Sequence, residues 1–422
     1  MAHEWRAARI EEVAEKVAMG PFGSSIKVET FVPTGVPVIS GQHLRGFKVA
    51  ESVQFNFVSY EHADRLKNAN VQRGDIIFTH AGNIGQVAYV PEDSKFERYV
   101  ISQRQFYMRC DRSKVIPEFV VAYFKTPEGQ HKLLANASQV GVPSIAQPVT
   151  YLRTIEILVP PLPEQRAIAQ ILGTLDDKIE LNWRMNETLE AIARAIFKSW
   201  FVDFDPVRAK AEGHDPGLPK HIADLFPDSF EDSELGEIPE GWGVRELGSL
   251  LELAYGKALK EENRKPGQIP VFGSNGQVGW HDEKLAGGPG VILGRKGNPG
   301  VVTWVPTDFF AIDTTFYVVP KADCRSLYFI FYALDIQNLA SLGADSAVPG
   351  LNRNLAYMSK QIVPPSDLLE FFDSRVKLFF QRIHEADSES STLAALRNAL
   401  LPKLISGELR VKDAERFVEV QL

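Results

Sequence analysis

Two long segments of the chain carry apolar residues at positions seven apart, the spacing of a helix that packs along another helix. The first segment follows Pro160 and Pro161, and the second follows Pro364 and Pro365. We expect the two helices to pair through Ile168, Leu175, Asn182, Leu189 and Ile196 in the first segment and through Phe372, Phe379, Ala386, Leu393 and Leu400 in the second. Companion rows pass through Leu172, Ile179, Met185 and Ile192, and through Val376, Ile383 and Leu396.

A helix from Pro163 to Val202 is about 60 Å long at about 1.5 Å per residue, longer than one globular module needs to cover its own core. The economical partner is the second helix. A chain that leaves one module along its helix and returns through the other favours an antiparallel coiled coil, with the modules at its opposite ends. Asn182 either fixes the register from a buried position or lies partly exposed where the seam drifts, and the pattern leaves both interpretations open.

The module before each helix, and part of the helix itself, occur twice in the sequence. GNIGQVAYVPED at Gly82 returns as GNPGVVTWVPTD at Gly297, 215 positions later, and TLEAIARAIFKSWF at Thr188 returns as TLAALRNALLPKLI at Thr392, 204 positions later. HEWRAARIEEVAEKVAMG, GVPVISGQ and GVPSIAQPVTY have counterparts in the same order in EGWGVRELGSLLELAYG, QIPVFGSNGQ and AVPGLNRNLAY. Five anchors in one order indicate an internal repeat in which loops vary in length and the helix does not.

Each module is expected to mix strands and helices. GDIIFTHAGNIGQVAYV and PGVILGRKGNPGVVTWV have the pattern of a β-hairpin, and PEFVVAYFKTPEGQHKLLA and SLYFIFYALDIQNLASL have helical spacing. The fold class is therefore α+β, with two mixed α/β domains that are each followed by a long helix, the two helices pairing as an antiparallel coiled coil with pseudo-twofold symmetry. The expected divisions are a first domain at 1–160, a first arm at 161–205, an acidic linker at 206–238, a second domain at 239–363, a second arm at 364–410 and a tail at 411–422.

Composition narrows the function classes. The formal charge of −8 equals the excess within Asp203 to Glu240, where three basic side chains stand against eleven acidic ones, so basic faces remain possible elsewhere. Two cysteines, Cys110 and Cys324, can form neither a disulfide framework nor a zinc site. The chain has no apolar run of about 20 residues and no signal-peptide pattern, which leads us to expect a cytoplasmic protein without a membrane partner.

The segment PLPEQRAIAQILGTLDDKIELNWRMNETLEAIARAIFKSWFVDF, a second module and the helix end LRNALLPKLISGELRV together resemble the specificity subunit of type I restriction-modification systems. The second arm departs from this pattern, because SDLLEFFDSRV stands where the first arm has LPEQRAIAQIL. The resemblance implies two target recognition domains that each read one half of a split target in double-stranded DNA, held apart by helices that bind methylation subunits. It also implies restriction subunits as partners, with S-adenosylmethionine, ATP and Mg²⁺ used by the partner subunits and not by this chain.

Base edges are read by side chains with paired donors and acceptors, and phosphate contacts only position a protein. Such residues interrupt the apolar strands of both modules. The DNA-binding candidates are Gln42, His43, Arg45, His80, Gln86, Gln103, Arg104, Gln105 and Gln147 in the first module and Ser274, Asn275, Gln277, Arg295, Lys296, Asn352, Arg353 and Asn354 in the second.

Comparison of the two copies ranks these candidates. A device that reads two different half-sites should vary where it reads, so the recurring Asn83 and Asn298 are assigned to turn geometry. His80 against Arg295, and Gln147 against Arg353, differ and are better reader candidates. The histidines His62, His131 and His281 lack metal-ligand spacing and are expected at the surface.

No catalytic or metal site is expected, because the chain shows no glycine-rich nucleotide fingerprint, no P-loop and no Asn-Pro-Pro-aromatic run of an adenine methylase. Two alternatives stay open. One is a stand-alone DNA methyltransferase or nuclease with an unrecognised motif, which would transfer methyl groups or cut DNA alone. The other is a helical adaptor that binds only proteins and no duplex.

Overall fold

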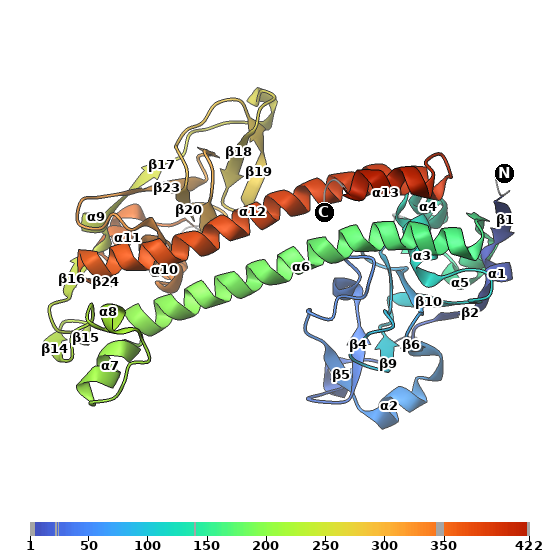
Figure 1. Cartoon of the computed structure of the whole chain (residues 1–422), viewed down its shortest axis with the longest axis horizontal. Helices are drawn as coiled ribbons and strands as arrows, with labels where there is room; N and C mark the ends of the chain where they lie inside the picture. Colours follow the sequence, from blue (N-terminus) through green and yellow to red (C-terminus); the bar gives the residue numbers. More distant parts are fainter. Residues whose placement is uncertain (1–4, 22, 24, 139–140, 343–349, 420–422) are drawn as a thin grey trace. The chain divides into compact units, whose positions relative to one another are not determined.

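The computed structural model describes residues 5–21, 23, 25–138, 141–342 and 350–419 (Figure 1). Its contacts divide the chain into two compact units, unit 1 at Met1–Asn182 with Glu389–Leu422 and unit 2 at Trp183–Ser388. Each unit therefore contains one globular module and part of both long helices. Two of the repeated segments lie partly outside the described residues. They are HEWRAARIEEVAEKVAMG, which begins at His3, and AVPGLNRNLAY, which begins at Ala347.

The module of unit 1 contains two main sheets. A four-stranded antiparallel sheet is ordered β2 (Ala14–Met19), β10 (Gln105–Cys110), β7 (Ile76–Thr79) and β8 (Val87–Tyr89). A five-stranded sheet is ordered β3 (Phe31–Val32), β5 (Asn56–Val58), β4 (Val36–Ile39), β9 (Arg98–Ile101) and β6 (Asn70–Gln72), and its β4 and β9 are parallel. Two small pairs complete it, β1 (Arg6–Arg9) with β13 (Glu156–Val159) and β11 (Ala137–Ser138) with β12 (Ser144–Ile145).

The module of unit 2 repeats this topology. Its four-stranded sheet is ordered β17 (Leu251–Tyr255), β23 (Thr315–Pro320), β20 (Gly290–Gly294) and β21 (Val302–Val305). The parallel pair of β4 and β9 returns as β18 (Ile269–Gly273) and β22 (Phe310–Ala311), and the pair of β1 and β13 returns as β16 (Gly243–Glu246) and β24 (Lys360–Val363). One difference is β19 (Gly276–His281), which folds back on β18 as a hairpin. The predicted repeat of mixed α/β modules is confirmed.

Helices cover the sheets in equivalent places. Unit 1 contains α1 (Ile10–Val13), α2 (Tyr60–Arg65), α3 (Pro117–Lys125), α4 (Pro127–Leu134) and α5 (Pro148–Thr154). Unit 2 contains α9 (Leu247–Leu250), α10 (Leu327–Ile336) and α11 (Arg353–Met358). Phe119 and Phe124 of α3 are fully buried in the core of unit 1, and Phe329 of α10 is fully buried in the core of unit 2. Each such ring stabilises its unit by roughly 1.5–3 kcal/mol through removal of apolar area from water.

The hairpin turns owe their shape to glycine. Gly82 and Gly85 between β7 and β8 have φ values of 84° and 87°, and Gly297 and Gly300 between β20 and β21 have φ values of 82° and 83°. Residues with a Cβ avoid this region, whereas glycine enters it freely. Asn83 and Asn298 lie in these turns, as predicted, but outside this region, so the positive φ values belong to the flanking glycines.

The two long helices are α6 (Leu162–Phe201) and α12 (Ser366–Ile405) (Figure 1). They pack together in antiparallel fashion within each unit, as predicted. In unit 1, Asp176 and Lys178 of α6 contact Arg397 and Glu389 of α12, and in unit 2 Asn186 of α6 contacts Asp387 of α12.

The seam follows the predicted main row more closely than the companion row. Ile168, Leu175 and Asn182 of the main row are buried, while Leu189 and Ile196 are half-buried. On α12, Phe379 is half-buried, and the buried members of the main row are Phe372, Ala386, Leu393 and Leu400.

The companion row of α6 was predicted wrongly after Ile179. It runs through Asn186 and Ala193, which keep the seven-residue spacing, while Ile192 is 41% exposed.

Asn182 is 2% exposed, and its Nδ2 donates to Glu389 Oε2 at 2.7 Å and to Ser390 Oγ at 3.3 Å, so the interpretation as a buried polar seam residue holds.

The acidic segment after α6 is a folded part of unit 2. It contains α7 (Asp205–Ala211), α8 (Lys220–Ala223) and the hairpin of β14 (Phe230–Ser233) and β15 (Gly236–Pro239). At the end of α6, Trp200, Phe201 and Phe204 are buried, and Phe201 packs edge-on against Phe372 with ring centroids 5.0 Å apart. Aromatic side chains thus fill the junction between the end of α6 and the module of unit 2. α13 (Val411–Glu419) ends the described chain in unit 1.

Candidate nucleic-acid interface

Loops that are distant in the sequence meet at one surface of unit 1. The His80 N–H donates to the Arg104 carbonyl at 2.9 Å, and the Ile145 N–H donates to the His80 carbonyl at 2.8 Å. The Gln86 Nε2 donates to the Gly41 carbonyl at 3.0 Å, which adds the turn after β4. We call residues 40–45, 80–86, 102–105 and 141–147 the loop surface of unit 1.

Unit 2 forms its own loop surface with the same backbone bonds. The Arg295 N–H donates to the Thr314 carbonyl at 2.9 Å, and the Leu351 N–H donates to the Arg295 carbonyl at 2.8 Å. The Asn298 Nδ2 donates to Asn275 Oδ1 at 2.5 Å, which ties in the turn after β18. We call residues 273–277, 295–300, 312–314 and 350–354 the loop surface of unit 2. Most of the predicted candidates are therefore brought together within their own unit.

The exposed candidates of unit 1 are Gln42, Arg45, Gln103, Arg104 and Gln147, and His80 and Gln86 are half-buried. The segments that form this loop surface contain neither aspartate nor glutamate. Arg104 and Arg45 thus meet no local carboxylate in these segments that would cancel their charge toward a phosphate backbone.

Two candidates of unit 1 have structural roles instead. His43 is 1% exposed, stacks on Phe55 at 4.3 Å between ring centroids, and accepts through Nδ1 from the Ser40 N–H. Gln105 is 1% exposed, and its amide oxygen accepts from the Ser102 hydroxyl. Buried side chains cannot reach a base edge, so the prediction that these two read DNA is corrected.

Gln86 also serves mainly to hold the surface together. Its Nε2 binds the Gly41 carbonyl, and its Oε1 accepts from the Thr79 hydroxyl at 3.3 Å, so both ends of the amide are engaged within the protein.

Burial lowers the pKa of His80, which keeps the imidazole neutral at pH 7. Its Nε2 lies 3.2 Å from the Gln103 carbonyl and therefore carries the ring proton.

Unit 2 presents two arginines on one aromatic ring. The guanidinium of Arg295 lies 4.9 Å from the ring centroid of Tyr255, and that of Arg353 lies 4.7 Å from it. Tyr255 remains 48% exposed at the end of β17, and among the residues that the structure describes the buried Nε of Arg353 has no hydrogen-bond partner. Stacking on an aromatic face holds a guanidinium plane in place and leaves its N–H fork available.

The other candidates of unit 2 surround this pair. Asn275, Gln277, Lys296, Asn352 and Asn354 are exposed, and Ser274 is half-buried. Arg295 Nη1 donates to the Asp313 carbonyl at 3.0 Å, so part of its fork is used internally. Asn352 caps α11, because its side chain accepts from the N–H groups of Asn354 and Leu355. Tyr255 was not among the residues predicted from the sequence, because a single aromatic residue at the end of a strand does not indicate a contact with arginine.

The predicted pairing of Gln147 with Arg353 agrees with the backbone bonds, because Ile145 and Leu351, two positions earlier in each copy, make equivalent bonds to His80 and Arg295. The two residues differ in their place relative to the next helix: Gln147 precedes α5 and has φ 44°, whereas Arg353 is the first residue of α11.

The lone histidines are placed differently from one another. His131 is exposed and His62 is half-buried, but His281 is 6% exposed and accepts through Nδ1 from the Lys265 N–H at 3.1 Å, so its expected surface position is corrected. Among the residues that the structure describes, no group of three or more histidine, cysteine, aspartate or glutamate side chains is arranged for a metal ion. Within the same residues, no helix has the length and apolarity to cross a membrane.

Comparison with known proteins supports the resemblance seen in the sequence. Residues 2–191 match the family described as type I restriction modification DNA specificity domain. The chain is 25% identical over 410 residues to the type I restriction enzyme HindI specificity subunit of Haemophilus influenzae, covering 80% of this chain and 87% of that protein. It is 24% identical over 434 residues to the MjaIX specificity subunit of Methanocaldococcus jannaschii, covering 97% and 94%.

A solved structure shares the fold. The S subunit of a type I restriction-modification system from M. genitalium superposes with a TM-score of 0.60, covers 96% of both chains and is 19% identical in sequence.

Proposed function

Because the chain belongs to the family of type I restriction-modification specificity subunits, we propose that it is the subunit that recognises DNA sequence in such a complex. The observation that carries this proposal is the pair of loop surfaces, which are built on the same backbone hydrogen bonds but present different polar side chains. A repeated frame with unlike reading residues is what recognition of two unlike half-sites requires.

The chemistry of each surface suits duplex DNA. Arginine donates a bidentate pair to guanine, and glutamine or asparagine pairs with adenine in the same way. Unit 1 offers Arg104 and Gln103 on one loop, and unit 2 offers Arg353 beside Asn354. Lys296 and Arg45 are exposed and carry positive charge for phosphate contacts, which position the protein without reading sequence.

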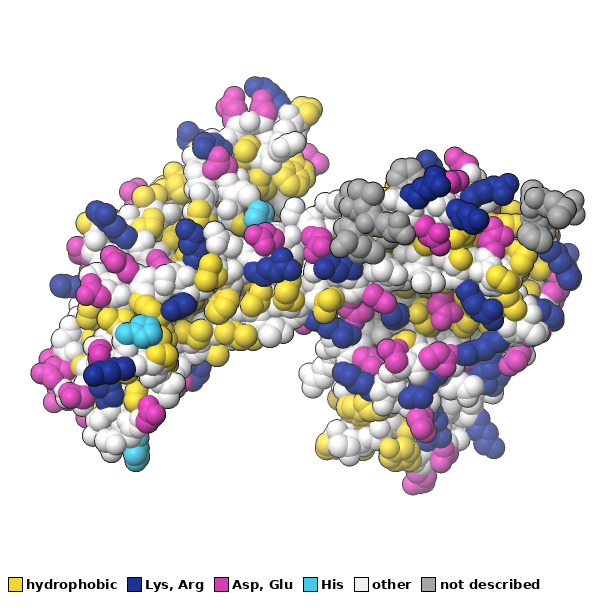
Figure 2. All heavy atoms as spheres, viewed as in Figure 1, with side chains coloured by type: hydrophobic (Ala, Val, Ile, Leu, Met, Phe, Trp, Pro, Cys, Tyr) yellow, Lys and Arg dark blue, Asp and Glu magenta, His cyan; other side chains and the backbone are white. Residues whose placement is uncertain are grey.

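The paired helices supply the second part of the function. We assign α6 and α12 to setting the number of unread base pairs between the half-sites and to binding the methylation subunits. Exposed apolar side chains on the helix segments of unit 2 support the second role, because Trp183, Ile192 and Leu378 are 44%, 41% and 58% exposed. Figure 2 shows hydrophobic side chains gathered along the region of these helices. S-adenosylmethionine, ATP and Mg²⁺ are then used by the partner subunits, which catalyse methylation and cleavage.

The first experiment tests the division of reading between the modules. Cells that express this chain with its methylation subunits are analysed by methylation-site sequencing. Arg104→Ala is expected to relax one half-site, and Arg353→Ala the other, each by about 1–3 kcal/mol of discrimination at one base pair. The matched controls Arg65→Ala and Arg382→Ala remove exposed arginines that lie outside both loop surfaces, and they should leave the methylated sequence unchanged. An unchanged motif in both test variants, or a change in both halves from one variant, would refute the assignment.

The second experiment tests the spacer. Insertion of four residues after Asn186, with a matching insertion in α12, adds about 6 Å of helix. Duplex DNA rises about 3.4 Å per base pair, so the unread gap should lengthen by one to two base pairs. A methylated motif with the original gap would contradict the role of the helices as a spacer.

A further inference from the structure

The outer edge of the four-stranded sheet in unit 1 is covered by the chain itself. The Tyr89 N–H of β8 donates to the Phe47 carbonyl at 3.0 Å, and the Val49 N–H donates to the Tyr89 carbonyl at 2.9 Å. Residues 47–49 thus lie along β8 in a parallel bridge. This short segment adds one more strand to an edge that would otherwise present open donors and acceptors.

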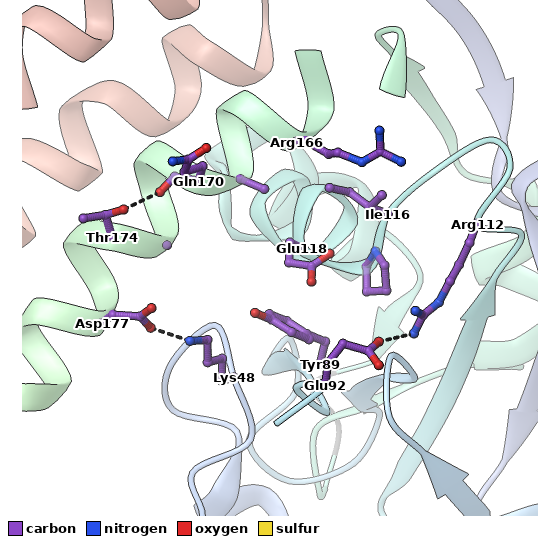
Figure 3. Close-up of a pocket in the computed structure, with 13 residues that line it drawn as sticks. Lys48, Tyr89, Glu92, Arg112, Ile116, Glu118, Arg166, Gln170, Thr174 and Asp177 are labelled. Carbon is purple, nitrogen blue, oxygen red and sulfur yellow. Dashed lines mark hydrogen bonds and ion pairs between the residues drawn. The ribbon is translucent and has the colours of Figure 1, made fainter. Parts of the chain in front are cut away.

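The same segment is anchored on α6. Phe47 is 6% exposed, and its N–H donates to Asp176 Oδ2 at 3.2 Å. The Lys48 Nζ donates to Asp177 Oδ1 at 2.5 Å, and Figure 3 shows Lys48 extended toward Asp177 beside the ring of Tyr89. An aromatic side chain enters the core while the next, basic side chain pairs with a carboxylate on the helix. The adjoining cavity of about 520 Å³ has its charged groups partly paired already, since Glu92 also binds Arg112.

Unit 2 has the same edge without the covering segment. Trp304 of β21 is the counterpart of Tyr89 of β8. Trp304 pairs with Val291 and Tyr89 pairs with Ile76, and each residue of the second pair lies 215 positions before its counterpart in the first. Because alternate residues of an antiparallel strand point their backbone groups outward, the N–H and carbonyl of Trp304 face away from β20. The chain that leaves β18 turns back as β19, and no residue of the described ranges bonds to the backbone of Trp304 on this side.

A cavity of about 310 Å³ lies beside this open edge, between β21, α10 and the two long helices of unit 2. Its aromatic wall contains Trp304, Phe331 and Phe380, with ring centroids of Trp304 and Phe380 4.6 Å apart. Glu190 and Asp387 supply carboxylates at its lining. Burial raises the pKa of both groups. In Glu190 the neighbouring Arg194, which also lines the cavity, lowers the pKa and repulsion from Asp387 raises it, so a further cation in this cavity would favour the charged form of Glu190.

We propose that the edge of β21 and this cavity bind an extended segment of a partner protein in which an aromatic residue is followed by lysine or arginine. The segment adds a strand to β21 through the backbone of Trp304, as residues 47–49 do on β8. Its aromatic side chain fills the cavity against Trp304 and Phe380, and its basic side chain pairs with Glu190 and Asp387. The proposal rests on the unlike edges of the two sheets and does not depend on DNA recognition.

The test uses the full chain and a synthetic peptide with the sequence of residues 44–50, acetyl-LRGFKVA-amide, measured by isothermal titration calorimetry. We expect saturable binding of one peptide per chain. The peptide acetyl-LRGAKVA-amide lacks the aromatic ring and should bind at least tenfold more weakly. Peptide binding that is absent up to millimolar concentration, with the protein folded by circular dichroism, overturns the proposal.

Charge reversal distinguishes the cavity from the rest of the surface. Glu190→Lys should weaken binding of acetyl-LRGFKVA-amide at least tenfold, because it places a cation where the peptide lysine would lie. Glu385→Lys makes the same change in net charge at an exposed residue of α12 outside the cavity, and it should alter binding less than twofold. Equal effects of the two variants contradict the assigned site. A dimer of the wild-type chain that the peptide dissociates in sedimentation velocity would show that a second copy, and not a partner protein, is the occupant.

Discussion

The ion pair between Asp176 of α6 and Arg397 of α12 gives a direct test of helix pairing in unit 1. Arg397 Nη1 lies 2.5 Å from Asp176 Oδ1, and the two side chains are only 21% and 14% exposed. Removal of one partner from a buried pair costs about 3–5 kcal/mol, whereas an exposed pair is worth about 0–1 kcal/mol. Since this pair is mostly buried, we expect Asp176→Ala to lower the free energy of unfolding by about 3 kcal/mol. Loss of the bond from the Phe47 N–H is included in this value.

The neighbouring aspartate is a matched control. Asp177 binds Lys48 at the same distance of 2.5 Å, but their side chains are 54% and 28% exposed. Asp177→Ala should therefore cost about 1 kcal/mol or less. In a double-mutant cycle with Arg397→Ala, Asp176 should show a coupling energy of about 1.5–3 kcal/mol, and Asp177 should show none above about 0.5 kcal/mol.

The assay is urea unfolding of the full chain, with hydrogen exchange of the amides of residues 393–404 to report on α12 itself. Faster exchange there in Asp176→Ala, but not in Asp177→Ala, would locate the loss at the helix pair. If the two alanine variants are equally stable, or if the cycle shows no coupling, the helices are not held together in the way described.

Two predictions concern pH. Burial lowers the pKa of Lys125 from 10.5 to about 8, so the unfolded chain binds more protons between these values and stability should rise with pH from about 8 to 10.5. Lys125→Met should abolish about 2 kcal/mol of that rise in urea titrations at pH 8 and 10.5, and an identical rise in both proteins would contradict it. Burial raises the pKa of Asp373 from 3.8 to about 6, so its contribution to stability is present below pH 3.8 and lost by pH 6. Asp373→Asn should therefore gain about 2 kcal/mol relative to the wild type between pH 4 and 7, and a constant difference over this range would refute the assignment.

The fold was predictable because it is specified twice. Each strand and helix signal in the first module has a counterpart in the second, and the heptad rows fix two helices whose apolar faces need a partner. The companion row failed where a polar residue takes the inward position. Asn186 follows the seven-residue spacing and donates to Asp387, while the apolar Ile192 points outward. Following the apolar residues moved the predicted row one position off the seven-residue spacing, from Asn186 to Met185.

The individual site residues were harder to predict, because readers and scaffold use the same residue types. Gln86, Gln105 and His43 are polar and lie in the right loops, but their hydrogen bonds close inside the protein. Nothing in a single sequence separates an amide that ties two loops together from one that faces DNA. Tyr255 was missed for the related reason that its role depends on two arginines more than 35 positions away along the chain.

Whether a loop residue can vary depends on whether its backbone or its side chain makes the hydrogen bonds that hold the loops together. At residue 80 and at residue 295, the backbone N–H and carbonyl bond to equivalent loops in the two units, although the side chains are histidine and arginine. The frame therefore depends little on what these side chains are, and a substitution there leaves the backbone bonds in place. Residues such as Gln86, whose side chain itself joins two loops, lack this freedom, because any change would open a buried hydrogen bond at a cost of about 1–3 kcal/mol. A surface of this kind can change the sequence it reads at the first class of position without losing its fold.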